Sequence, residues 1–262
     1  CNTAECTFTI TVLAAPVIVE QPSDISVLYG MNAEFSIVAE YVDAYQWFGP
    51  NGLIAGAEGA SLLLEAVTLA DQGEYYVQVT NECGVISSEV VTLTVNPWTQ
   101  VIDLGGPVNG ASTFLSLVED DLATIFDPVM DDLQYVEFYQ PNKVFVPGSL
   151  SFPFTEERGA KVGLKSGYPT SVTVTGYPTL GSIVNLPAGW SIMPVWSQGV
   201  VLAEDVFGPL GANLIMAVSI DYSGVYWPAY NIKTLEHLVP GNAYLVALGV
   251  AGTIDFDVPL LK

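Results

Sequence analysis

Carboxylates are the most frequent side chains in this sequence that could do acid–base chemistry. Neighbouring acids occur at residues 119–121, 131–132, 156–157 and 204–205. Two carboxylates that flank a glycosidic bond can hydrolyse it. Adjacent acids on a helix point to different faces, however, so we expect most of these pairs to lie on the solvated surface. With no nucleophile elbow or phosphate-binding glycine loop in the sequence, we predict no catalytic residues and a protein that is not an enzyme.

Three aspartates are the candidates for a metal site. Asp131, Asp132 and Asp221 border predicted turns, and calcium prefers oxygen ligands. Neither an EF-hand nor a nonapeptide calcium motif accompanies them. The single histidine, His237, lies in a predicted helical turn and cannot complete a zinc site with three scattered cysteines. We expect no cofactor, with calcium as the alternative.

Aromatic side chains form the second group of candidates. Flat aromatic faces stack on sugars or apolar partners, but tryptophan and tyrosine also fill the cores of small β domains. Both interpretations stay open here, and surface glycans are one candidate partner. The residues concerned are Trp190, Trp196, Tyr226, Trp227 and Tyr230.

The charge balance excludes several classes of partner. The 262 residues include 28 acids and 6 bases, which gives a net charge of −22. Nucleic acids and anionic membrane surfaces bind clustered Lys and Arg, so neither is an expected partner. No apolar run approaches the ~20 residues that span a bilayer, and we expect no membrane insertion. A dispersed acidic surface suits an extracellular protein, which is the predicted location.

Residues 14–96 show the pattern of a small β-sandwich. Short strands alternate with turns, and Trp47 supplies a large aromatic side chain for the core. Asp71, Gly73 and Tyr75 have the spacing of a tyrosine corner. These features resemble the intermediate-set type of the immunoglobulin superfamily, which implies an immunoglobulin-like fold for this segment.

Two positions depart from that family. The residues that would carry the inter-sheet disulfide are Ile37 and Val77, so a bridge worth about 2–4 kcal/mol is absent. Cys83 lies instead in the predicted last hairpin, within an Asn-Glu-Cys-Gly segment that resembles bacterial immunoglobulin-like modules. With Cys1 and Cys6 the chain has three cysteines, so at least one is free or pairs outside the chain.

A strictly alternating segment, residues 7–12, predicts a half-buried strand with Phe8, Ile10 and Val12 on its apolar face. The pattern recurs 83 positions later (91 − 8) in the last strand of the predicted sandwich. We therefore expect residues 1–13 to be the last strand of a preceding immunoglobulin-like domain plus a linker. An unpartnered strand of this kind could also complete the sheet of another copy.

The rest of the chain contains an internal repeat. Leu133 and Leu214 lie 81 positions apart (214 − 133), each at the start of an apolar strand that leads to a polar turn, a short strand and a proline. Such self-similarity indicates a tandem duplication, with copy 1 at residues 97–180 and copy 2 at residues 181–262. Because a unit of about 80 residues buries its core poorly alone, we expect the copies to pack as a pseudo-symmetric pair.

Short helices are predicted inside each copy. In copy 1, Ser116 and Glu119 have the spacing of a capping box, and Pro128 should end the following helix near Phe126. In copy 2, a helical turn is predicted over residues 234–238. The predicted fold class is therefore mainly β: an immunoglobulin-like β-sandwich followed by a pseudo-symmetric tandem pair of small β-rich modules with short helices.

Copy 2 supports a second resemblance. The pairs Gly189-Trp190 and Trp227-Pro228 resemble a module found near the C-terminus of large secreted proteins of the Bacteroidetes, before a type IX secretion sorting domain. The resemblance implies a location rather than an activity, and we expect the chain to end short of such a sorting domain. Other copies of the chain or neighbouring domains are the expected partners.

These observations predict a non-enzymatic structural or adhesive segment of a modular bacterial cell-surface protein. Residues 7–12 would join subunits into a filament by strand addition. The alternative is an ancillary carbohydrate-binding region of a secreted enzyme, which the aromatic residues of copy 2 favour.

Overall fold

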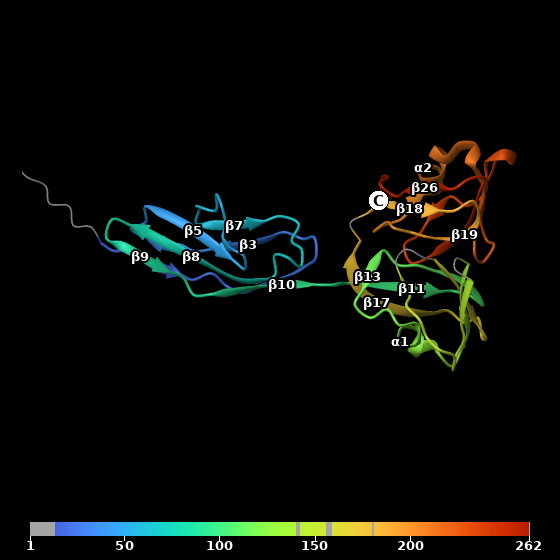
Figure 1. Cartoon of the computed structure of the whole chain (residues 1–262), viewed down its shortest axis with the longest axis horizontal. Helices are drawn as coiled ribbons and strands as arrows, with labels where there is room; N and C mark the ends of the chain where they lie inside the picture. Colours follow the sequence, from blue (N-terminus) through green and yellow to red (C-terminus); the bar gives the residue numbers. More distant parts are fainter. Residues whose placement is uncertain (1–13, 140–141, 156–158, 180, 262) are drawn as a thin grey trace, which may run out of the picture. The chain divides into compact units, whose positions relative to one another are not determined.

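The computed structural model describes residues 14–139, 142–155, 159–179 and 181–261. The chain forms two compact units that divide between Asn96 and Pro97, and both are mainly β (Figure 1). In the part of the chain that the structure describes, no helix is long and apolar enough to cross a membrane. The predicted strand with Phe8, Ile10 and Val12 lies outside the described residues.

The N-terminal unit is a β-sandwich. One layer consists of the pairs β1–β4 and β3–β7, and the other is a sheet in the order β2–β10–β8–β5–β6, with β9 paired to β8. Strand β2 runs parallel to β10, whereas the other pairs are antiparallel. The strands are β1 (Val17–Glu20), β2 (Ile25–Leu28), β3 (Ala33–Ser36), β4 (Val38–Glu40), β5 (Ala44–Gly49), β6 (Gly52–Leu53), β7 (Ser61–Leu64), β8 (Gly73–Asn81), β9 (Gly84–Ser87) and β10 (Val91–Asn96).

The core between these layers follows from the alternation of the sequence. Phe35 on β3 and Trp47 on β5 are buried, and the ring of Phe35 stacks on Tyr75 at 4.9 Å between centroids. The hydroxyl of Tyr75 donates to the carbonyl of Asp71 (2.6 Å), which is the geometry of a tyrosine corner. Strand order, core tryptophan and corner together define an immunoglobulin-like sandwich.

Apolar side chains fill the space of the absent inter-sheet disulfide. Ile37 and Val77 are both buried members of the core. Cys83 lies in the turn between β8 and β9, where it is exposed and free. The unit is therefore held together by packing, and its stability depends on the aromatic core.

Replacing Tyr75 by phenylalanine should lower the free energy of unfolding by about 1–2 kcal/mol, because the Asp71 carbonyl loses its donor while the ring packing survives. Urea unfolding of the whole chain, monitored by a signal that reports on the N-terminal unit, measures the change in its free energy of unfolding. Tyr76→Phe is the matched control, since the Tyr76 ring stacks on Phe48 (4.7 Å) and that stack does not need the hydroxyl. Equal stability of the two variants would contradict the corner's contribution.

The first half of the C-terminal unit, residues 97–180, contains two sheets, in the orders β11–β17–β13 and β12–β16–β14–β15. Helix α1 (Leu122–Phe126) passes into the 3-10 turn η1 (Asp127–Val129) at Pro128, as the sequence predicts. The strands are β11 (Trp98–Leu104), β12 (Val108–Ala111), β13 (Leu115–Leu117), β14 (Leu133–Tyr139), β15 (Asn142–Phe145), β16 (Ala160–Leu164) and β17 (Thr170–Pro178).

The second half, residues 181–262, has sheets in the orders β18–β26, β19–β25–β21–β22–β23 and β20–β24. Helix α2 (Ala203–Phe207) passes into η2 (Gly208–Asn213), and η3 (Pro228–Tyr230) follows β22. The strands are β18 (Ile183–Leu186), β19 (Gly189–Pro194), β20 (Val201–Leu202), β21 (Leu214–Ser219), β22 (Val225–Trp227), β23 (Ile232–Lys233), β24 (His237–Leu238), β25 (Ala243–Leu248) and β26 (Gly252–Asp255).

The two halves have matching strand pairings. In the first half β11 pairs with β17 and β12 with β16, and in the second half β18 pairs with β26 and β19 with β25. The register shifts at the start of β14, between Leu133 and Tyr135, and at the same place in β21, between Leu214 and Met216. The matching pairs include Ile102–Val172 with Val184–Ile254, and Ala111–Ala160 with Pro194–Ala243.

The predicted capping box is wrong. Ser116 lies in β13, where it pairs with Tyr177 of β17. Asp121 is the N-cap of α1 instead, and its carboxylate accepts from the N–H of Thr124 (3.2 Å). Asp121 is adjacent to the first helical residue, whereas Ser116 is held in the sheet by its backbone partner.

The predicted helical turn over residues 234–238 is also wrong. His237 and Leu238 form β24, which pairs with β20. The carbonyl of Glu236 accepts from the N–H of Ala203 (2.9 Å). Backbone partners from a distant segment therefore outweigh the local helical pattern at this position.

Candidate functional site

The two halves of the C-terminal unit meet through close backbone contacts. Strand β12 lies against β25, and β19 lies against β14 and β16. A Cβ atom at Gly110 would come within 2.2 Å of the carbonyl oxygen of Ala243, and one at Gly159 would lie 2.7 Å from the Ala243 side chain. Glycine is thus the residue that allows the strands of the two halves to approach this closely.

Ser112 links the same strands by hydrogen bonds. It is fully buried, and its N–H donates to the carbonyl of Gly241 (2.8 Å). Its hydroxyl donates to the carbonyl of Asn242 and accepts from the N–H of Val195 (3.2 Å). One side chain of the first half therefore satisfies backbone groups on two segments of the second.

Replacing Ser112 by alanine should lower the free energy of unfolding by about 1–3 kcal/mol, because two buried backbone groups lose their partner. Urea unfolding of the full chain measures this loss. Ser116→Ala in β13 is the control, since Ser116 is exposed and surface changes stay within about 0.5 kcal/mol. A loss at Ser112 no larger than at Ser116 would show that the bonds do not hold the halves together.

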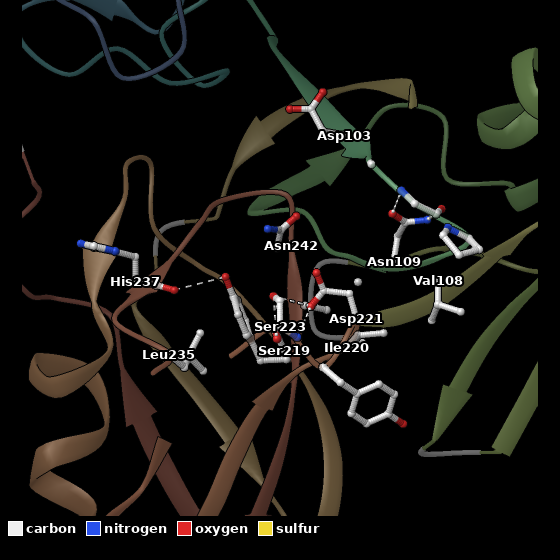
Figure 2. A pocket seen from close by; sticks show the side chains of 17 residues that line it. Asp103, Val108, Asn109, Ser219, Ile220, Asp221, Ser223, Leu235, His237 and Asn242 are labelled. Carbon is white, nitrogen blue, oxygen red and sulfur yellow. Dashed lines mark hydrogen bonds between the residues drawn. The ribbon is translucent and has the colours of Figure 1, made fainter. Parts of the chain in front are cut away.

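A cleft of about 700 Å³ opens where the two halves meet (Figure 2). The end of β11, the loop of residues 105–107 and β12 form one wall, and they come from the first half. The turn between β21 and β22 and the start of β25 form the other wall, and they come from the second half. Neither half encloses the cleft alone.

The turn between β21 and β22 is fixed by its own serines. Ser219 Oγ accepts from the N–H of Gly224 (2.7 Å), and Asp221 Oδ1 accepts from the N–H (3.1 Å) and hydroxyl (2.8 Å) of Ser223. Partial burial raises the pKa of Asp221, but the hydrogen bonds from Ser223 and Ser219 outweigh it and hold the pKa below its usual value. The carboxylate is therefore charged over the whole neutral and mildly acidic range.

The stabilisation from Asp221 should persist into acid. Its folded pKa lies below its unfolded value of about 3.9. Its contribution is therefore fully present above that value and is lost only as the pH falls through the folded pKa. A ¹³C NMR titration of the Asp221 carboxyl measures this midpoint, and Ser223→Ala should raise it. A midpoint at or above about 3.9 in the unchanged protein would contradict the assignment.

Tyr244 and His237 also line the cleft and are joined by a hydrogen bond. The buried hydroxyl of Tyr244 accepts from the N–H of Val239 (3.1 Å) and donates to the carbonyl of His237 (3.4 Å). Burial raises the pKa of Tyr244, and the charge of Asp221 adds to the rise. The imidazole of His237 points away from the other labelled lining residues (Figure 2).

The opposite wall is held by Asn109. Its Oδ1 accepts from the N–H of Gly106 (3.0 Å) and its Nδ2 donates to the Gly106 carbonyl (2.7 Å), so the buried side chain fixes the loop. Asp103 at the end of β11 is exposed. Among the described residues that line the cleft there are two carboxylates, Asp103 and Asp221, but no Lys or Arg. The cleft therefore favours hydrogen-bond donors and disfavours anions.

The aromatic residues that the sequence singles out do not share one surface. Tyr226 is 3% exposed; its hydroxyl donates to Glu204 (2.9 Å) and its ring packs on Phe207. It is a core residue, which agrees with core packing, the other of the two interpretations that the sequence left open. Trp196 is partly buried and packs against the cores of both halves.

Three other aromatic residues lie nearer the surface. Trp227 and Tyr230 form an edge-to-face pair with 4.3 Å between ring centroids, and Tyr230 is 67% exposed. Trp190 on β19 is 45% exposed. Trp227 and Tyr230 are therefore brought together by the turn η3, whereas Tyr226 faces the other way into the core.

The three aspartates proposed as calcium ligands lie in two places. The carboxylate of Asp132 accepts from the N–H (2.7 Å) and hydroxyl (2.5 Å) of Ser166, and the carbonyl of Asp131 accepts from Lys165 (2.9 Å). Asp221 lies in the cleft. The described residues contain no group of three or more His, Cys, Asp or Glu that could hold a metal ion. Calcium binding stays a prediction.

The sequence did not single out most of the cleft. Asp103, Asn109, Asn242 and Tyr244 come from segments more than 100 residues apart, and each looks like an ordinary turn or strand residue by itself. The local signals were the turn sequences Gly-Gly-Pro at 105–107 and Pro-Gly-Asn at 240–242. They mark turns but carry no information on which turns meet.

The solved structures named below each match 31–32% of the chain. Neither a protein-family model nor a curated protein matches. Among solved structures, the chain is similar to a chimeric titin Z1Z2 protein (26% identity over 32% of this chain and 97% of that one, TM-score 0.28). It is similar to a titin M10 complex with obscurin-like 1 (25% identity over 31% of this chain and 93% of that one, TM-score 0.28). It is also similar to tandem Ig repeats of Dlar (20% identity over 32% of this chain and 48% of that one, TM-score 0.29).

Proposed function

We propose that this chain is a non-enzymatic structural or adhesive segment of a modular extracellular protein. The observation that carries the proposal is the close packing of two matching halves at Gly110 and Gly159. Such an interface makes one stiff unit from two small modules, which suits a spacer or a platform for binding. The net charge of −22 supports an extracellular location, since a dispersed acidic surface keeps such a protein soluble.

The finer parts of the proposal rest on the sequence. The matching strand pairings support descent of the halves, residues 97–180 and 181–262, from one duplicated module. A bacterial source, with secretion by the type IX route as in the Bacteroidetes, rests on the resemblance of the second half alone. Assembly into a filament rests on the alternating strand of residues 7–12, which would complete the sheet of a neighbouring copy.

Light scattering and negative-stain microscopy test the assembly state directly. The full chain and a version that lacks residues 1–12 are compared at the same concentration. Polymers that disappear on deletion would make the segment the connector of a filament. Monomers in both samples would overturn filament assembly and leave a spacer or adhesive segment.

A second candidate function is carbohydrate binding in support of a secreted enzyme. The exposed Tyr230 beside Trp227 favours it, because exposed aromatic faces stack on sugar rings. The test is a broad glycan array with the unchanged chain and with Trp190→Ala and Trp227→Ala variants. Binding that is lost in folded variants would support it. Variants that unfold, together with no binding by the unchanged chain, would refute it.

A further inference from the structure

We infer that the cleft between the two halves binds a neutral, polyhydroxylated ligand of the saccharide class. The inference rests on the adhesive function proposed above and names its ligand chemistry. The site is distinct from the Trp227–Tyr230 pair, because those residues are not among its lining. It is built by the loop of residues 105–107, the turn between β21 and β22, and the start of β25.

Charge and hydrogen-bonding capacity select the ligand. The carboxylates of Asp103 and Asp221 accept hydrogen bonds from hydroxyl groups, and the amide of Asn242 can donate as well as accept. Figure 2 shows Asp221 and Asn242 directed into the space between the two walls. An anion would face two negative charges, and an apolar ligand would remove water from the carboxylates of Asp103 and Asp221 without replacing its hydrogen bonds. A neutral polyol satisfies them without either cost.

The backbone of Tyr222 supplies an independent reason. Tyr222 lines the cleft with φ of 60°, in the left-handed region that favours glycine, yet its side chain is 67% exposed. A bulky residue in this conformation costs about 1–3 kcal/mol, and such strain gathers at binding sites. Because the ring is mostly exposed, its burial does not offset this conformational cost. The exposed ring of Tyr222 offers an aromatic face on which a sugar ring can stack.

Size and rigidity fit the same conclusion. Ligand pockets for small molecules have volumes of about 300–1,000 Å³, and this cleft has about 700 Å³. The serines fix one wall and Asn109 fixes the other, and the buried residues Ile220 and Leu235 also border the cleft. A preformed site of this kind loses little entropy on binding.

The test uses NMR with the full chain and three neutral probes: maltohexaose, cellohexaose and mannohexaose. At least one probe should shift the backbone amides of residues 105–107 and 219–224 at millimolar concentration. Tyr222→Gly should weaken that binding by about tenfold or more and leave the melting temperature equal or higher, because glycine relieves the strained φ. Asp103→Asn should weaken binding as well, through loss of the charged acceptor.

Tyr41→Gly is the matched control, since Tyr41 has φ of 59° in the N-terminal unit and should gain stability without any change in binding. Three results would overturn the inference: no shift with any probe, full binding by Tyr222→Gly, or calcium alone shifting the same amides. A negative result here with polymers in the assembly experiment would leave the structural function standing. Binding by the cleft without polymers would support an adhesive segment that does not assemble into a filament.

Discussion

Replacing Gly110 by alanine should destabilise the C-terminal unit by about 2–3 kcal/mol or more. The added Cβ would lie 2.2 Å from the carbonyl oxygen and 2.7 Å from the nitrogen of Ala243. Both are backbone atoms of β25, which is hydrogen-bonded on both sides by β19 and β21. Neither β12 nor β25 can move away without breaking hydrogen bonds to its neighbouring strands, so a small shift cannot remove the steric clash.

The Gly110→Ala effect is measured by urea unfolding together with hydrogen exchange of the β12 and β25 amides. Faster exchange should appear on both strands, because the change forces the two halves apart. Gly105→Ala is the control: a Cβ there meets nothing within 4 Å, and the residue has an ordinary φ. Equal urea midpoints of unfolding for the two variants would mean that the packing of the two halves does not depend on the contact between Gly110 and Ala243.

Replacing Trp47 by alanine should cost the N-terminal unit about 3–5 kcal/mol. The side chain is fully buried, its ring packs 6.0 Å from that of Phe35, and its Nε1 donates to the carbonyl of Gly59 (2.9 Å). The substitution therefore leaves both a cavity and a carbonyl without its donor. Domains have only about 5–15 kcal/mol of stability, and this one has no inter-sheet disulfide to offset the loss.

Calorimetry of the full chain measures the Trp47→Ala effect, which should appear as a lower melting transition for the N-terminal unit with the C-terminal unit unchanged. Leu53→Ala is the control in the same unit, because Leu53 is 60% exposed and contributes little burial. A melting temperature for Trp47→Ala within the range of the control would refute the dependence on this side chain.

The local sequence pattern was sufficient to predict the β-sandwich of the N-terminal unit. The alternation at Ala33, Phe35 and Ile37, the core tryptophan and the tyrosine corner each follow from residue type and spacing. The burial and hydrogen bonds of the structure agree with them. The end of α1 was equally predictable, because Pro128 has no N–H to continue the hydrogen bonds of the helix that precedes it.

Local pattern failed where a distant partner decided the outcome. Ser116 had a good capping-box sequence, but pairing with Tyr177 holds it in a strand. His237 lay in a helical pattern, but pairing with β20 made it a strand residue. In both cases backbone hydrogen bonds to a remote segment outweighed a weak local preference.

The sequence by itself determined the immunoglobulin-like sandwich, the 81-residue spacing of Leu133 and Leu214 (214 − 133) and the acidic surface. These depend on residue type, periodicity and charge, which the chain carries locally. Only the tertiary structure decided that Gly110 contacts Ala243, that Tyr226 is core, and that the two halves enclose a polar cleft. The cleft is made by turns far apart in the chain, and their meeting depends on how two faces pack, which no local pattern encodes.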